Sequence, residues 1–228
     1  MSNTPIQSIQ TSKFWLATLA VIFSTIHITL FPAVSVATEA KPIHIVAFGD
    51  SLTAGYQLPP GDAFPVQLER ALRARGHNVK ISNAGVSGDT TRGGLERFDW
   101  AVPQDTDAVI LELGANDALR GIAPKVTKQN LSGILKKLKA RQIPVLLAGM
   151  QALANWGEEY AQKFNAIYPD LANVNDAILY PFFMEAVIDN PALKLSDALH
   201  PNAKGVQLIV TKILPDVEKL IARVKAKQ

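Results

Sequence analysis

Short apolar runs alternate with amphipathic stretches along most of this chain, and this alternation constrains its fold more than any other feature. Runs typical of strands cover residues 43–48, 78–84, 107–113, 143–149 and 177–179. The run "DAVILEL" at 107–113 has apolar residues on both sides, as in a strand buried within a parallel sheet. Strand and helix repeated about five times predict parallel strands joined by helical crossovers. We therefore expect a three-layer α/β/α domain with a mainly parallel sheet of about five strands.

The stretches between these runs are predicted to be helices. They lie at residues 63–76, in a shorter stretch that ends near Trp100, at 124–140, at 155–172, and after Pro201. We expect Pro215 to kink or split the last helix, because proline has no N–H to donate within a helix.

The N-terminal segment differs from the rest of the chain. Up to Ala37 its only charged side chain is Lys13, which is followed by an apolar run at 14–31. A secretory signal peptide at 1–37, cleaved after Ala37, would leave a domain at 38–228 in the periplasm or outside the cell. The alternative is an uncleaved segment that anchors the protein in a membrane.

Composition and missing motifs exclude several kinds of chemistry. None of the 228 residues is cysteine, which excludes disulfides, thiolate zinc sites and a cysteine nucleophile. The formal net charge of +3 is too small to indicate a nucleic-acid partner. The chain has no P-loop and no H-E-x-x-H, and no G-x-S-x-G surrounds Ser51 or Ser87. We expect no cofactor and no metal, and the sequence does not indicate an oligomeric state.

Polar residues follow three of the expected strands. Asp50 and Ser51 follow the first strand, Gly85 lies in "NAGVSG" at the end of the second, and Asn116 and Asp117 follow the third. Ligands of open parallel sheets bind outside the carboxyl ends of the strands. These three loops are therefore expected to share one rim of the sheet.

A serine becomes a nucleophile only when a base removes its proton, so Ser51 needs a histidine. His44 lies within a strand and His77 in a turn, and both are expected to be structural. His200 stands three residues after Asp197, a spacing that can place the carboxylate against the imidazole. Two other interpretations stay open, in which Ser51 only caps a helix and Asp197 with His200 is only a surface pair.

Attack on an acyl carbon also requires hydrogen-bond donors where negative charge develops. The candidates on the same rim are the Ser51 amide, the Gly85 amide and the Asn116 side chain.

Four sequence blocks, in order, resemble the SGNH or GDSL hydrolase family over almost the whole chain after residue 37. They are "GDSL" at 49–52, Gly85 in "NAGVSGDTT", "GAND" at 114–117 and "DALHP" at 197–201. The resemblance implies a flavodoxin-like fold, with Ser51 as nucleophile, Gly85 and Asn116 completing an oxyanion hole, and Asp197 with His200 as acid and base. Longer strings such as "ELGANDALRG" and "YPFFMEAV" resemble the exported bacterial thioesterases, lysophospholipases and arylesterases. Leu199 stands where that branch often has isoleucine.

The expected function is hydrolysis of a carboxylic ester or thioester, as in an arylesterase, an acyl-CoA thioesterase or a lysophospholipase. Met150, Leu153 and Trp156 follow the fourth strand and are candidates for contact with the substrate, whereas Phe182 and Phe183 are expected in the core. Two alternatives stay open: a carbohydrate acetylesterase, and an exported module that binds a small ligand without turnover. In each case the partner is a small molecule, and after cleavage of the signal peptide no membrane insertion is expected.

Overall fold

Five parallel strands form one sheet in the computed structural model, which describes residues 41–152 and 154–227. The strands are β1 (Ile43–Gly49), β2 (Val79–Gly85), β3 (Ala108–Glu112), β4 (Val145–Ala148) and β5 (Ile178–Tyr180). Their order across the sheet is β2-β1-β3-β4-β5. Both the number of strands and their parallel direction confirm the sequence prediction.

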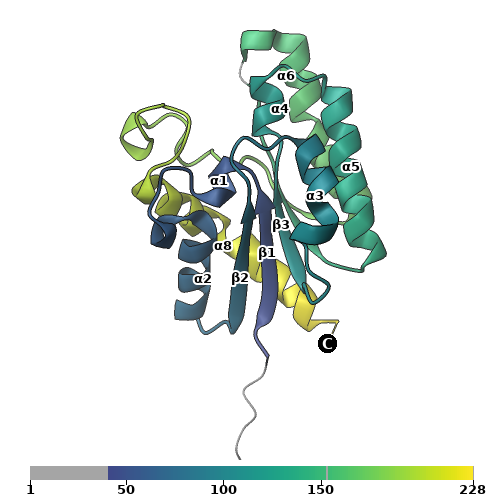
Figure 1. Cartoon of the computed structure of the whole chain (residues 1–228), viewed down its shortest axis with the longest axis vertical. Helices are drawn as coiled ribbons and strands as arrows, with labels where there is room; N and C mark the ends of the chain where they lie inside the picture. The colour runs from purple at the N-terminus through teal and green to yellow at the C-terminus, as the bar shows by residue number, and fades with distance from the viewer. Residues whose placement is uncertain (1–40, 153, 228) are drawn as a thin grey trace, which may run out of the picture. The chain divides into compact units, whose positions relative to one another are not determined.

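Helices cover both faces of this sheet. They are α1 (Ser51–Ala54), α2 (Phe64–Ala74), α3 (Thr91–Ala101), α4 (Ala115–Leu119), α5 (Pro124–Ala140), α6 (Glu158–Asn165), α7 (Ile167–Asn175) and α8 (Ala203–Lys225). Single turns of 3-10 helix lie at Pro60–Asp62, Ala154–Trp156 and Pro191–Leu193. Figure 1 shows α2 and α8 on one side of the sheet and α3 and α5 on the other, which gives the three expected layers.

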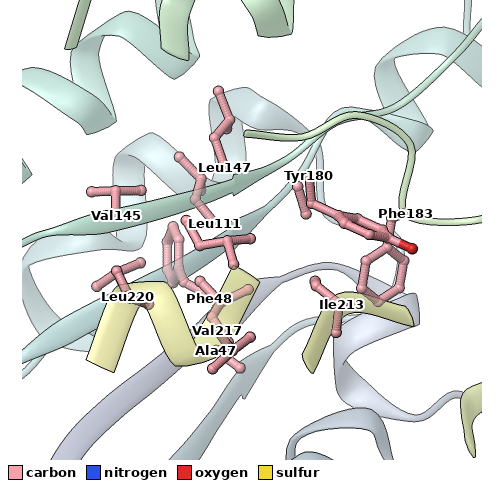
Figure 2. Close-up of a cluster of buried hydrophobic side chains, with 14 of the residues drawn as sticks. Ala47, Phe48, Leu111, Val145, Leu147, Tyr180, Phe183, Ile213, Val217 and Leu220 are labelled. Atoms are coloured by element: carbon pink, nitrogen blue, oxygen red, sulfur yellow. The ribbon is translucent and has the colours of Figure 1, made fainter. Parts of the chain in front are cut away.

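The central strands are buried on both faces, which explains their almost continuous apolar sequences. Every residue of β1, β3 and β4 is buried, whereas the edge strand β2 alternates between buried and exposed positions in its first half. Figure 2 shows buried side chains of β1, β3, β4 and α8, among them Phe48, Leu111, Leu147 and Val217. Phe48 packs edge to face against Phe98 of α3. This packing holds the carboxyl ends of the strands at fixed relative positions.

The prolines of two predicted helices have different effects. The single helix expected at 155–172 is two helices, α6 and α7, which meet at Ala166. Pro169 cannot donate to the Asn165 carbonyl, and its ring crowds that carbonyl. Pro215, by contrast, does not split α8. Buried side chains on both sides of Pro215, such as Ile213 and Val217, hold both halves of α8 against the sheet.

The signal peptide predicted at 1–37 and the start of the domain predicted at 38–228 lie outside the described residues. Within residues 41–152 and 154–227, no helix combines the length and apolar character needed to cross a membrane.

Candidate active site

Ser51, His200 and Asp197 form one continuous row of hydrogen bonds. Ser51 is the first residue of α1, directly after β1, while Asp197 and His200 lie in the loop before α8. The Ser51 Oγ lies 2.8 Å from His200 Nε2, and His200 Nδ1 lies 2.6 Å from Asp197 Oδ2. The Tyr56 ring lies beside the imidazole, with 4.5 Å between ring centroids. Groups separated by about 150 residues in sequence are therefore in direct contact.

The loop that carries Asp197 and His200 is shaped by its own hydrogen bonds. Asp197 Oδ1 accepts from the backbone N–H of Leu199 at 2.9 Å and of His200 at 3.0 Å, and Ala198 between them has a positive φ of 58°. Burial alone would raise the pKa of Asp197, but these two N–H groups and the imidazole lower that pKa to about 2. At neutral pH Asp197 is therefore an anion, able to orient the imidazole and to stabilise its protonated form.

Ser51 is positioned by the two residues before it. Asp50 caps α1, because its Oδ1 accepts from the Leu52 N–H at 3.0 Å. Gly49 leaves no space for a side chain, since an added Cβ would lie 2.1 Å from Thr53 Oγ1. The Gly-Asp-Ser sequence thus serves a tight turn from strand to helix, with the serine at its end.

Two buried carboxyl groups lie beneath this turn, and sequence reasoning missed one of them, Glu112. Its Oε2 accepts from Thr53 Oγ1 at 2.7 Å and from the Asp50 N–H at 3.3 Å. Its Oε1 is buried without a hydrogen-bond partner in the described part of the chain. Burial, followed by the nearby Asp50, raises the pKa of Glu112 well above its ordinary value. A glutamate inside the otherwise apolar run "AVILEL" was the available signal.

Asp50 is fully buried as well, and it contacts the predicted oxyanion residue Asn116. The Asn116 Nδ2 donates to Asp50 Oδ2 at 3.2 Å. Burial raises the pKa of Asp50 to about 6, although the Leu52 N–H and Asn116 both favour its ionised form. The bond to Asp50 fixes which end of the Asn116 amide is the donor, and it leaves the second N–H of Nδ2 for another acceptor.

The backbone donors predicted beside Asn116 differ from one another. The Ser51 N–H has no acceptor among the described residues, so it is available to a ligand. The Gly85 N–H already donates to Asn83 Oδ1 at 3.0 Å. Gly85 instead allows close packing, because an added Cβ would lie 2.3 Å from the Ala54 nitrogen. In the same loop Gly88 has a positive φ of 82°, and its N–H has no acceptor within the described residues.

A cavity of about 370 Å³ opens beside this row of residues. It is lined by Ser51, Asn116 and His200 together with mainly apolar side chains: Leu52, Ala115, Ala118, Leu119, Met150, Ala152, Phe182, Met184, Ile188, Ala198 and Leu199. Gln151, Asn155 and Asp189 add polar groups. The three chemically distinctive residues thus face an apolar space of the size of a small organic molecule.

The residues predicted to contact substrate are only partly placed at this cavity. Met150 lines it, while Leu153 lies outside the described residues. Trp156 does not line it, because its indole N–H donates to the Ala118 carbonyl at 2.8 Å and its ring covers Gly121. Phe182, expected in the core, lines the cavity, whereas Phe183 is buried in the core as expected.

His44 and His77 have structural contacts, as the sequence predicted. His44 Nε2 lies 2.8 Å from Ser82 Oγ, and His77 Nε2 lies 3.2 Å from Glu218 Oε1. Across the residues that the structure describes, no three His, Asp or Glu side chains gather as metal ligands would.

Comparison with known proteins identifies the family. The model of the GDSL-like lipase/acylhydrolase family matches residues 47–208, which include every element that carries the site. The chain belongs to this family. The chain is therefore a carboxylic ester hydrolase, as predicted from the sequence. The resemblance drawn from its four sequence blocks is confirmed.

Relatives of this GDSL-like chain are named as esterases or thioesterases. An arylesterase of Vibrio mimicus is 38% identical over 193 residues, 84% of this chain and 96% of that protein. Thioesterase 1/protease 1/lysophospholipase L1 of Escherichia coli K12 is 36% identical over 178 residues, 78% of this chain and 84% of that protein. The crystal structure of AlinE4, an SGNH-hydrolase family esterase, has 49% identity and a TM-score of 0.68, and the match covers 79% of this chain and 97% of AlinE4.

Proposed function

We propose that this protein hydrolyses small, uncharged carboxylic esters through an acyl-enzyme formed on Ser51. The observation that carries the proposal is the row Ser51–His200–Asp197, with 2.8 Å and 2.6 Å between its members, at the edge of an apolar cavity. If Ser51 only capped a helix, its hydroxyl would not need to contact His200. If Asp197 and His200 were only a surface pair, His200 would not need to contact Ser51.

Each group in the row has a definite part in the proposed reaction. His200 Nε2 removes the proton of Ser51 Oγ as the oxygen attacks the ester carbonyl, and the Asp197 anion stabilises the imidazolium. His200 then protonates the leaving alkoxide. Water attacks the acyl-enzyme by the same route in the second half of the reaction, and the free acid and Ser51 are released.

The negative charge on the carbonyl oxygen needs donors that are already oriented. We assign this part to the Ser51 N–H, to the second N–H of Asn116 Nδ2 and to the Gly88 N–H, none of which has an acceptor among the described residues. Gly85 can take part only if its N–H leaves Asn83 Oδ1.

The cavity lining supports the choice of substrate. No lysine or arginine occurs among the described residues that line it, and Asp189 adds a carboxylate. This lining favours an uncharged aryl or short acyl ester over the polyanionic coenzyme A thioesters. The arylesterase relative supports the same class. Thioester hydrolysis is the second candidate, because the Escherichia coli relative is named a thioesterase. A carbohydrate acetylesterase is less well supported, since most of the lining is apolar.

The proposed reaction is tested with purified enzyme and a panel of 4-nitrophenyl butyrate, butyryl-CoA, a lysophospholipid and an acetylated sugar. We expect the highest kcat/KM on the aryl ester, and a loss of about a millionfold in kcat for Ser51→Ala. Ser132→Ala, which changes an exposed serine of α5 outside the cavity lining, is the matched control and should keep full activity. A protein that binds these compounds without turnover would contradict the proposal.

Export remains a proposal of its own. It is supported by the sequence of residues 1–37 and is tested by intact mass and N-terminal sequencing of protein recovered from a bacterial periplasm. A mature chain that begins near Thr38 supports cleavage, whereas a membrane-bound chain of full length supports the anchor.

A further inference from the structure

Arg97 is a buried arginine that takes no part in the proposed reaction, yet it connects two of the loops that form the active site. Arg97 lies on α3, and only 8% of its side chain is exposed. Its Nε donates to Asp89 Oδ2 at 2.6 Å, its Nη1 to the Ala84 carbonyl at 2.9 Å and its Nη2 to the Gly49 carbonyl at 2.8 Å. The guanidinium carbon also lies 4.1 Å from the centre of the Phe48 ring. A buried cation is stable only with such complete pairing.

The positions of its three partners are more informative than their number. Gly49 is the last residue of β1 and Gly85 is its register partner at the end of β2. Arg97 therefore binds the carbonyl just before Asp50 and Ser51, and also the carbonyl just before Gly85. Asp89 lies at the other end of the segment 85–88, so one guanidinium holds this segment at both ends.

Because a peptide group is planar, these contacts also fix the direction of the N–H group that follows each bound carbonyl. In a trans peptide the C=O and the following N–H are rigidly opposed, so a bond that fixes one also fixes the other. The Gly49–Asp50 peptide is held at both sides, because its C=O accepts from Arg97 and its N–H donates to Glu112. The Ala84–Gly85 peptide is held in the same way by Arg97 and by Asn83.

This arrangement depends on the residue types at positions 93 and 97. An added Cβ at Gly93 would lie 1.9 Å from Asp89 Oδ1, so Asp89 approaches α3 only because position 93 is glycine. A lysine at position 97 could not reproduce the contact, since an ammonium is a point charge whereas the guanidinium presents a planar fork to several acceptors.

We propose that Arg97 is a positioning residue that sets the distance between Ser51 and the backbone donors of the segment 85–88. The proposal rests on the proposed function, because it assumes that Ser51 is the nucleophile and that this segment helps to hold the oxyanion. Arg97 does not touch the substrate, so its loss should slow the chemical step without weakening substrate binding.

The test compares Arg97→Lys with Arg141→Lys, a matched control. Arg141 also donates to two backbone carbonyls, those of Val102 and Pro103, and it lies over the ring of Phe98. These carbonyls precede β3, at the end of the sheet opposite to Ser51. Both variants should lower the melting temperature, but only Arg97→Lys should change catalysis.

Activity is measured with 4-nitrophenyl butyrate, as kcat per serine titrated with a fluorophosphonate, so that unfolded protein does not count. For Arg97→Lys we expect kcat to fall by about 10- to 100-fold with KM within about twofold of the parent value. For Arg141→Lys we expect both constants within about twofold of the parent values. The double variant Arg97→Met with Asp89→Asn leaves no unpaired buried charge and should lose at least as much as Arg97→Lys.

If the position 97 variants that fold keep the parent kcat, or if Arg141→Lys loses as much kcat as they do, the positioning role is wrong. If no position 97 variant folds, Arg97 is essential to the fold and the catalytic role is likewise rejected. An inactive parent enzyme, or activity that survives Ser51→Ala, would instead overturn the proposed function, so the two failures are distinguishable.

Discussion

Replacing Asp50 with asparagine should raise stability at alkaline pH while it lowers activity. Burial raises the pKa of Asp50 from its ordinary value of 3.8 to about 6. An acid whose pKa is higher in the folded than in the unfolded protein destabilises the fold when it is ionised. This penalty is absent below pH 3.8, grows as the pH rises, and is complete above about pH 6. At 1.36 kcal/mol per pH unit, it amounts to about 3 kcal/mol in the free energy of unfolding.

Asp50→Asn has no such penalty, because its side chain does not ionise. The free energy of unfolding of the variant, relative to the parent, should therefore increase by about 3 kcal/mol between pH 3.5 and pH 8. Urea denaturation at both pH values measures this increase, and effects of packing cancel because they are equal at the two pH values. A relative stability that does not change with pH would refute the raised pKa of Asp50.

The same variant should be a poor enzyme. If the new side-chain oxygen keeps the bond to the Leu52 N–H, its NH2 group faces Asn116 Nδ2, and two donors cannot pair. The Asn116 amide must then reverse, which turns its oxygen toward the site where a donor is needed. We expect kcat to fall by about 100- to 1000-fold, the usual cost of losing one oxyanion donor. A folded variant with the parent kcat would contradict the role given to Asn116.

Four further substitutions, at three positions, test the charges and hydrogen bonds of the site. Asp189→Lys should raise the ratio of kcat/KM for butyryl-CoA to that for 4-nitrophenyl butyrate by about fivefold or more, because it reverses the charge that lines the cavity. Asp197→Asn should lower kcat by about 10⁴-fold. Because the pKa of Asp197 is lowered to about 2, the parent should also lose stability relative to this variant as the pH falls from 4 to 2. Denaturation curves of both proteins across this pH range measure the loss. Glu112→Leu, which removes the acceptor of Thr53 Oγ1 and of the Asp50 N–H, should lower the melting temperature, whereas Glu112→Gln, which keeps an acceptor oxygen, should lower it less.

The sheet could be predicted because its signals are local. The buried strands are short apolar runs, the edge strand β2 alternates, and periodic helical stretches lie between them, so the parallel topology follows from this alternation. The effects of Pro169 and Pro215 could not be separated in this way. Both residues interrupt a helical pattern, and the difference lies in packing: the apolar face of α8 is buried on both sides of Pro215.

The site could be predicted as far as residue types and motif order define it. Ser51, Asp197, His200 and Asn116 lie where the four blocks suggested. The state of the Gly85 amide could not be predicted, because it depends on a hydrogen bond from the side chain of Asn83, two residues earlier.

Two partners of the strand ends were missed for a similar reason. Glu112 stands out only as a charge within an apolar run and Arg97 appears as an ordinary helix residue, and it is their hydrogen bonds in the structure that show both holding the turn before Ser51. Trp156 was predicted to contact substrate but does not line the cavity. Its indole N–H donates to the Ala118 carbonyl instead, a contact that the sequence does not indicate.

The most direct test of the account is to find which serine is the nucleophile, by locating the serine that a fluorophosphonate phosphonylates. The protein is reacted with a fluorophosphonate and digested, and the modified peptide is sequenced by mass spectrometry. We predict one adduct per chain, on Ser51, formed far more slowly when His200 is replaced by alanine. An adduct on Ser87, or an unmodified protein that still hydrolyses esters, would contradict it.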